Sequence, residues 1–341
     1  MSSESHDGSL AVSRESWVRS AAGAAMAWLR SMPVFPLLVL MFIVGAFVHE
    51  SFLTFENVVS GILYQSSVLG VLVLGETFIL ISRRFDLSIE SIVGVAPAAG
   101  IWLMMPTAQG GSGLGLNVAV GIILIFVVGA VVGLLNGFLV VKLRLNTFII
   151  TLAMLMLLRG VTLGITKGAM IFNLPPAVVF IGGARVGPIP VAVLLTLFLF
   201  IAGGMFLRYH RLGKAIYAMG GNEVAARAGG VRVERLRLGL FILSGVLAAL
   251  AGLMLTGRTA TVLPSQGANM VFSVMASAVI GGVSLNGGRG SMLGAYLGVL
   301  LIGTVQNILT LSSISSFWIN AIFGGIIVVA VVMSKYTAQK R

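Results

Sequence analysis

Long apolar runs are the feature that most constrains what this chain can fold into. Many of them reach the roughly 20 residues that a helix needs to cross the hydrocarbon core of a bilayer. Only 9% of the residues are charged, whereas a soluble domain usually carries about 25%. The sequence therefore predicts an all-α, polytopic membrane helix bundle of about ten spans. The predicted spans cover residues 34–50, 58–82, 87–106, 117–141, 146–166, 189–207, 238–257, 270–283, 291–309 and 316–334.

The distribution of Lys and Arg predicts the orientation of this bundle. An even number of spans places both termini on one side, and if that side is the cytoplasm, 18 of the 22 basic residues lie inside. Such an asymmetry follows the positive-inside rule. We therefore expect a multi-pass protein of the cell inner membrane with both termini cytoplasmic. Its predicted parts are a tail over 1–32 with an interfacial helix at 16–31, a transmembrane domain over 33–335 with a cytoplasmic loop at 208–238, and a tail over 336–341.

The composition also excludes several classes of function. The net charge of +12 is spread over short loops, so it fits topology better than nucleic-acid binding. The chain has no Cys and only three widely separated His residues, which argues against a metal site. No phosphate-binding loop with the required spacing and lysine occurs, and no catalytic constellation stands out. We expect a non-enzyme that binds no cofactor itself.

One segment stands apart from the oily remainder, the basic stretch over 211–239, "RLGKAIYAMGGNEVAARAGGVRVERLRLG". Asn222 is a good helix N-cap, and Glu223 places negative charge at the positive end of the helix dipole. Glycines before and after predict a helix of two turns or fewer, which is marginal unless it docks on a partner. The small side chains of Ala225 and Ala226 leave room for the surface of such a partner. A loop lying on the membrane surface is the alternative.

Several stretches of the chain resemble a known family. "LGKAIYAMGGNEVAARAGGV", "RLNTFIITLAMLMLLRGVTLGITKG", "AVIGGVSLNGGRGSMLGAYLGVLLIG" and "ISSFW" are similar to segments of ribose-type ABC importer permeases, a group whose wider family includes branched-chain amino-acid permeases. The resemblance covers roughly residues 55 to 335. It implies a permease subunit for a monosaccharide or similar small polyol, in which the short helix after Asn222 couples to a separate ATPase. The implied coupling residues are Gly221, Asn222, Glu223, Ala225, Ala226, Arg227 and Gly230.

The resemblance also implies a set of partners. These are ABC ATPase subunits that carry ATP and Mg²⁺, an extracytoplasmic sugar-binding protein, the lipid membrane, and a second permease subunit, either identical or a relative. Two motifs depart from the family pattern. Residues 83–90 read "RRFDLSIE", where the family has a Gly-Gly-Ile-Asp-Leu-Ser-Val-Gly break, and residues 271–273 read "VFS" in place of Glu-Leu-Asp.

Polar residues inside the apolar runs are candidates for a substrate pathway. Arg159 is costly against lipid, so we expect it to face the bundle interior, either as a polar wall of the path or bonded to loop carbonyls near the outer face. Depth counted along the helices argues against a direct pair with Glu76. The complete set of pathway candidates is Asp86, Ser88, Asn136, Arg159 and Asn307.

Each of these candidates also has a purely structural interpretation. For Asp86 and Ser88 a capped cytoplasmic turn is favoured over a gate, and amides such as Asn136 and Asn307 commonly hold membrane helices together. The stretches 132–140 and 302–310 align at a shift of 170 residues, which suggests an inverted repeat with a substrate site at its interface. An ion-coupled transporter, an amino-acid permease and a membrane enzyme are the alternative functions.

Overall fold

The computed structural model describes residues 34–315, 318, 321–322 and 324–325. Most of the predicted span 316–334, both predicted tails and the predicted helix at 16–31 lie outside the described residues. Within them the regular secondary structure is almost all helix, which confirms the predicted fold class. The longer helices are α2 (Val34–Val48), α3 (Gln65–Ile81), α4 (Ile89–Met104), α5 (Val118–Val141), α6 (Thr147–Thr166), α8 (Val191–Tyr209), α9 (Arg211–Gly221), α11 (Val233–Thr259), α12 (Met270–Ile280) and α13 (Met292–Leu311).

Nine of the ten predicted runs correspond to one of these helices, with ends that agree to within a few residues. Within the described residues, six helical stretches, including the π-helical extension of α3 from Asn57, are long and apolar enough to cross a membrane. The helices α2, α4 and α12 are apolar but shorter. Polar caps explain several of the sharp starts, since Asn117 accepts a hydrogen bond from the Ala119 N–H and Asn146 accepts bonds from Phe148 and Ile149.

Several short elements were not predicted from the apolar pattern. The 211–221 part of the basic loop forms helix α9, and the segment between α6 and α8 contains helix α7 (Pro176–Gly183). A two-stranded antiparallel hairpin of β1 (Arg185–Val186) and β2 (Ile189–Pro190) follows. The smaller elements are η1 (Asn57–Tyr64), η2 (Thr107–Gln109) and α10 (Glu223–Ala228).

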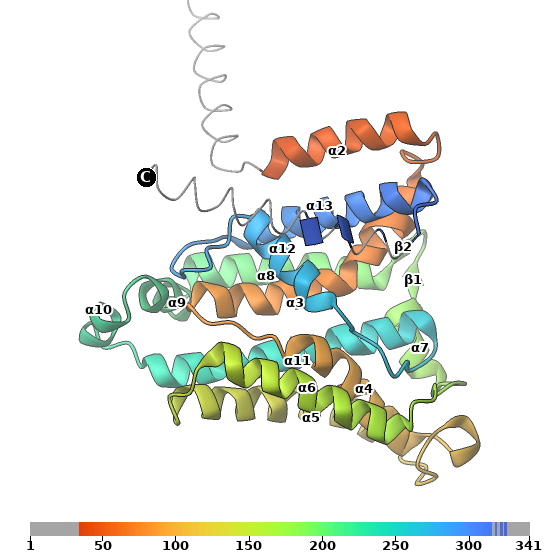
Figure 1. Ribbon diagram of the computed structural model, residues 1–341, viewed down its shortest axis with the longest axis horizontal. Coiled ribbons are helices and arrows are strands. Elements are labelled where there is room, and N and C mark those ends of the chain that lie inside the picture. The colour runs from red at the N-terminus through yellow and green to blue at the C-terminus, as the bar shows by residue number, and fades with distance from the viewer. Residues whose placement is uncertain (1–33, 316–317, 319–320, 323, 326–341) are drawn as a thin grey trace, which may run out of the picture.

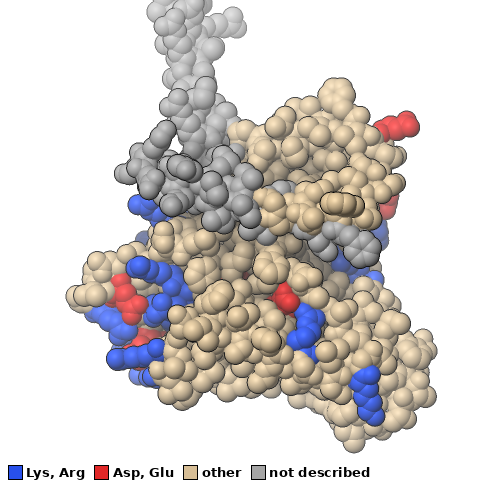
Figure 2. All heavy atoms as spheres, viewed as in Figure 1, with Lys and Arg blue, Asp and Glu red and all other residues tan. Residues whose placement is uncertain are grey.

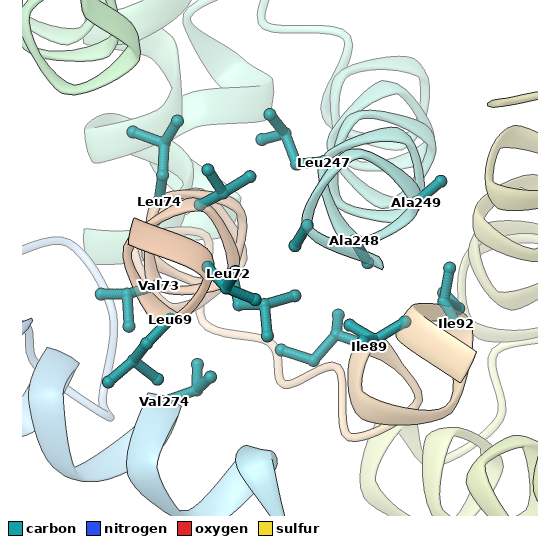
Figure 3. Close-up of a cluster of buried hydrophobic side chains, with 14 of the residues drawn as sticks. Leu69, Leu72, Val73, Leu74, Ile89, Ile92, Leu247, Ala248, Ala249 and Val274 are labelled. Atoms are coloured by element: carbon teal, nitrogen blue, oxygen red, sulfur yellow. The ribbon is translucent and has the colours of Figure 1, made fainter. Parts of the chain in front are cut away.

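Helices α3 and α11 form the centre of the bundle. They run side by side with α4 and α12 around them, and α5, α6 and α8 lie further out (Figure 1). In the most apolar window of the span that contains α3, 67% of the residues are buried, against 17% for α6. Figure 3 shows the packing among the central helices, with Leu72 of α3, Ile89 of α4 and Ala248 of α11 pointing toward one another. The core is therefore built from helices that lie far apart in the sequence.

Glycine allows the closest of these helix contacts. Helix α5 meets α11 where Gly129 faces Gly245, and a Cβ on either residue would overlap the backbone of the other helix. Such small residues are common where membrane helices approach each other. The 44 glycines of the sequence thus serve helix packing in part.

The connecting segments gather at two ends of the bundle, as the predicted topology requires. At one end, the Gly288 N–H donates to the Ile81 carbonyl and Lys142 pairs with Glu234. At the other end, residues near 171 pair with residues near 262 in an isolated bridge. Figure 2 shows Lys and Arg gathered around α9 and α10 at the first end, whereas the flanks are largely uncharged. The loops predicted to be cytoplasmic are therefore on one side of the structure.

Candidate functional site

Helix α10 is the short helix that the sequence predicted in the basic loop. Asn222 caps it, because its side-chain oxygen accepts a hydrogen bond from the Ala225 N–H at 3.0 Å. The helix ends at Gly229, and Gly230 takes up a positive φ of 84°, a conformation that glycine adopts without strain. Asn222 is also the C-cap of α9. A single extended residue therefore separates two helices. The expected helix of two turns or fewer is present, but the glycines before it belong to α9.

The two faces of α10 differ in what they contact. Ala226 is only 6% exposed and belongs to the hydrophobic core, because α10 packs against α9 and α11 on that side. Val224 is 78% exposed, and Ala225 and Ala228 are exposed with it. The expectation that Ala226 leaves room for a partner is therefore wrong, since this chain already fills that space. The free face consists of Val224, Ala225 and Ala228.

Ion pairs brace this helix against the start of α11. Glu223 accepts hydrogen bonds from Arg237 at 2.8 Å and from Arg227 at 2.9 Å. The Arg237 side chain is 4% exposed, so it reaches Glu223 from a buried position. Chiefly through the Arg237 hydrogen bond, these arginines lower the pKa of the Glu223 carboxyl from its ordinary value of 4.5 to about 2. Glu223 is therefore ionised throughout the neutral range, and Arg227 contributes to the brace and to the exposed surface alike.

The C-terminal end of α9 packs against the C-terminal end of α3 at a glycine junction formed by Gly220, Ile81 and Gly288. A Cβ on Gly220 would overlap the carbonyl oxygen of Ile81. The same oxygen accepts the hydrogen bond from the Gly288 N–H at 2.9 Å. Gly288 itself has a φ of 69°, and a Cβ on it would lie 2.7 Å from the Gly221 Cα. The two glycine-rich motifs of the sequence, around 220 and 288, thus meet on one carbonyl at the end of α3.

Beyond that carbonyl the chain turns back into the bundle before α4 begins (Figure 1). Asp86 and Ser88 in this segment are both fully buried. The Ser88 N–H and hydroxyl donate to the Asp86 carboxylate, and the Asn136 amide donates to the Ser88 hydroxyl oxygen at 2.7 Å. Glu76 accepts a hydrogen bond from the Asp86 N–H. Asp86 therefore caps a turn, as predicted, but the turn is inside the protein and not at its cytoplasmic surface.

Arg159 lies in a second buried cluster. Its guanidinium pairs with the Glu90 carboxylate at 2.9 Å and donates to the Gln266 carbonyl at 3.2 Å. Gln266 in turn bonds the backbone of α4 and α11. Arg159 is 12 residues beyond the start of α6, which corresponds to about 18 Å along the helix axis. The loop-carbonyl contact that we considered for Arg159 is present, and its charge partner is Glu90, not Glu76.

The position of Glu90 shows that α4 and α12 start inside the bundle and not at one of its ends. Glu90 lies in the first turn of α4, and its second oxygen accepts a hydrogen bond from the Val271 N–H in the first turn of α12. One carboxylate therefore serves two helix N-termini and one arginine. Helix N-termini that point toward the bilayer midplane are a common feature of substrate sites in transporters.

Asn307 is separate from both clusters. It exchanges hydrogen bonds of 2.9 Å with Asn57, which joins α13 to η1. The structure thus brings Asp86, Ser88 and Asn136 together and leaves Arg159 and Asn307 elsewhere.

Sequence reasoning missed Glu90, Gln266 and Arg237 as members of these clusters. The position of Glu90 at a helix N-terminus could have been predicted, since an acidic residue at the start of a short apolar run is typical of such a terminus. The roles of Gln266 and Arg237 could not, because each acts through partners far away in the sequence or on another helix.

Comparisons with known proteins place these features in context. The family described as "Branched-chain amino acid transport system / permease component" matches residues 58–332. The ribose import permease protein RbsC of Escherichia coli strain K12 is 32% identical over 318 residues, which cover 90% of this chain and 94% of that protein. The L-arabinose ABC transporter permease protein AraH of Azospirillum brasilense is 31% identical, covering 85% of this chain and 83% of that protein.

A third relative is the xylose transport system permease protein XylH of Escherichia coli strain K12, which is 30% identical over 85% of this chain and 87% of its own length. No solved structure matches the chain.

Proposed function

This chain belongs to the branched-chain amino acid transport system permease family, and from that premise we propose that it is the permease subunit of an ABC importer for a monosaccharide or a similar small polyol. Relatives named as ribose, arabinose and xylose permeases match 85 to 90% of the chain. These pentose permeases favour a sugar over an amino acid as the substrate.

The observation that carries the mechanism is the two-faced helix α10. Its inner face is fixed by Ala226 and by the Glu223–Arg237 pair, and its outer face of Val224, Ala225 and Ala228 is free. We infer that the free face docks in a groove of an ATPase subunit. Motion of that subunit would then pass through α9 and the Gly220–Ile81–Gly288 junction to the end of α3.

The energy source and the remaining partners follow from this role. ATP and Mg²⁺ would bind the ATPase subunits, and an extracytoplasmic binding protein would deliver the sugar. Two permease subunits, identical or paired with a relative, would enclose the pathway. Helix α6 supports such a pairing, because most of its surface in the described part of the chain is not covered by other helices.

We propose that the Arg159–Glu90 pair lines the substrate pathway. Three of the candidates are fully buried and hydrogen-bonded to one another, namely Asp86, Ser88 and Asn136. They therefore hold the segment between α3 and α4 in this conformation. The Arg159 side chain is 21% exposed while remaining paired. It therefore presents hydrogen-bond donors of the kind that sugar hydroxyls accept.

The proposed orientation places the α10 end of the bundle in the cytoplasm. Because the chain has no Cys, a single cysteine in place of Asn222 or Gly110 can be labelled selectively. We expect the cysteine at position 222 to react only from the cytoplasmic face and the one at 110 only from outside. Labelling of both from outside would contradict this topology.

The function is tested by reconstituting the chain in liposomes with a candidate ATPase subunit and a candidate sugar-binding protein. Ribose, arabinose, xylose and leucine are then compared for stimulation of ATP hydrolysis and for uptake. We expect one or more of the sugars to stimulate both, and leucine to stimulate neither. Stimulation by leucine alone would support the amino-acid alternative, and uptake without ATP would support an ion-coupled transporter.

A further inference from the structure

A groove of about 710 Å³ lies between α8, α9 and the start of α13. It is separate from both buried polar clusters and from the free face of α10. Its walls are apolar, formed by Leu197, Ile201, Met205 and Leu293, whose side chains are all exposed. Gly204 lies between them on α8 and has no side chain to fill the space. The groove can therefore accept an apolar chain that lies along α8.

One end of the groove is cationic. Arg208 and Lys214 line it at the end where α8 passes into α9, and none of the described acidic residues lines it. In the part of the chain that the structure describes, neither side chain takes part in an ion pair, although Arg208 lies over the Tyr209 ring. Ser291, the N-cap of the 20-residue helix α13, lines the groove as well. Helix N-termini attract anions, so this end offers two cations and the positive end of a helix dipole.

The length of the groove matches one leaflet of a bilayer. From Leu197 to Arg208 the helix advances by 11 residues, or about 16 Å at 1.5 Å per residue. Half of a hydrocarbon core of about 30 Å is nearly the same depth. The cationic end would then lie at the level of the lipid headgroups and the apolar walls among the acyl chains. Basic pockets between membrane helices on the cytoplasmic side are a known way of binding anionic lipids.

We propose that this groove binds an anionic glycerophospholipid of the inner leaflet, with its phosphate at Arg208 and Lys214 and an acyl chain along Leu197, Ile201 and Met205. The site adjoins the coupling end of the protein, because Tyr217 also lines the groove and donates a hydrogen bond to the Gly290 carbonyl at 2.7 Å. A bound lipid would contact both α9 and the segment that carries Gly288. It would therefore stabilise the arrangement on which α10 rests.

Native mass spectrometry of the purified permease, with equal amounts of phosphatidylglycerol and phosphatidylcholine of the same acyl chains, tests this proposal. We expect phosphatidylglycerol to be retained over phosphatidylcholine by about tenfold, since each cation near a headgroup adds to the attraction. The double variant Arg208→Gln, Lys214→Gln should lose the preference. The matched control Arg232→Gln, Arg235→Gln removes the same charge from exposed positions outside the groove and should keep it.

A second pair of variants separates the groove from surface charge. Gly204→Leu fills the groove without changing charge and should reduce the retention of both lipids several-fold. Gly239→Leu adds the same side chain on α11, where a Cβ meets open space, and should leave retention unchanged. Retained preference in the Arg208, Lys214 variant, or full retention in Gly204→Leu, would overturn the proposal. Displacement of the lipid by millimolar glycerol phosphate would also overturn it, since the site would then recognise a headgroup alone. The measurement uses the permease by itself, so its outcome does not depend on the proposed transport activity.

Discussion

Glu223 and Glu90 each lie in the first turn of a helix and each bind an arginine at nearly the same distance, 2.8 Å and 2.9 Å. Their surroundings are opposite. Glu223 is at the basic end of the bundle and is 36% exposed, whereas Glu90 is 7% exposed between the helices of the membrane domain. At the first site water can reach the Glu223 carboxylate when one of its arginine partners is lost. At the second site water reaches the carboxylate far less, because the helices around Glu90 enclose it.

The comparison shows that a Glu–Arg ion pair at a helix N-terminus can serve two purposes in one chain. Breaking a buried pair leaves an uncompensated charge and is costly, whereas exposed pairs contribute little. The Glu90–Arg159 pair is therefore suited to fixing where α4, α6 and α12 meet. The pairs around Glu223 are suited to an interface that must bind and release a partner.

The largest effect is expected from breaking the interior pair. Arg159→Leu should destabilise the protein by about 3–5 kcal/mol, because Glu90 is left buried without its partner. The double variant Arg159→Leu, Glu90→Gln should recover much of the thermal stability in detergent, while membrane insertion stays near normal in both. Wild-type stability and uptake in Arg159→Leu would show that the pair is dispensable. Recovery of stability without uptake in the double variant would identify Arg159 as part of the substrate path.

A smaller effect is expected at the glycine junction between the two regions. Gly220→Ala should cost about 1–3 kcal/mol, because its Cβ would overlap the Ile81 carbonyl and force the backbones apart. Gly221→Ala is the matched control, since a Cβ there meets nothing within 4 Å. ATP hydrolysis coupled to uptake should fall in the first variant only. Equal behaviour of the two variants would mean that the junction transmits nothing.

The smallest effect is expected at Glu223, the more exposed of the two carboxylates. Glu223→Gln should lower stability by about 1 kcal/mol at neutral pH, since the Gln amide keeps a hydrogen-bond acceptor for the buried Arg237 and water reaches position 223. The folded-state pKa of Glu223 is depressed to about 2 from 4.5, so this stabilisation is present above pH 4.5 and is lost as the pH falls toward 2. The difference in melting temperature between wild type and Glu223→Gln should therefore shrink over that range. A difference that is independent of pH would contradict the assignment.

The same comparison explains how much could be predicted from the sequence. Local signals predicted the exposed region well, because the Asn222 cap, the acidic first turn and the stop at Gly229 act within a few residues. Nine apolar runs likewise predicted nine helices to within a few residues. The interior could not be predicted in this way, since the Glu90–Arg159 contact joins residues 69 positions apart.

Two further errors have the same physical origin. The run at 87–106 was expected to be a full span, but the chain returns into the bundle at Asp86 and α4 starts deep inside it. Ala226 was expected to face a partner, but α9, which the sequence did not reveal, lies against that side of α10. In each case the decisive contact comes from another element. The residue pattern along one segment carries no information about a contact with another segment.

The central claim is that the free face of α10 receives the ATPase, and Ala225→Trp tests it most directly. Ala225 is exposed and its neighbour Ala226 is buried, so a large side chain at 225 should clash with a partner and not with this chain. Ala225→Ser is the control. The account predicts normal membrane abundance and melting temperature, at least tenfold weaker co-purification of the ATPase, and lost uptake in Ala225→Trp alone. Uptake at the wild-type rate by an Ala225→Trp permease that still holds its ATPase would contradict it.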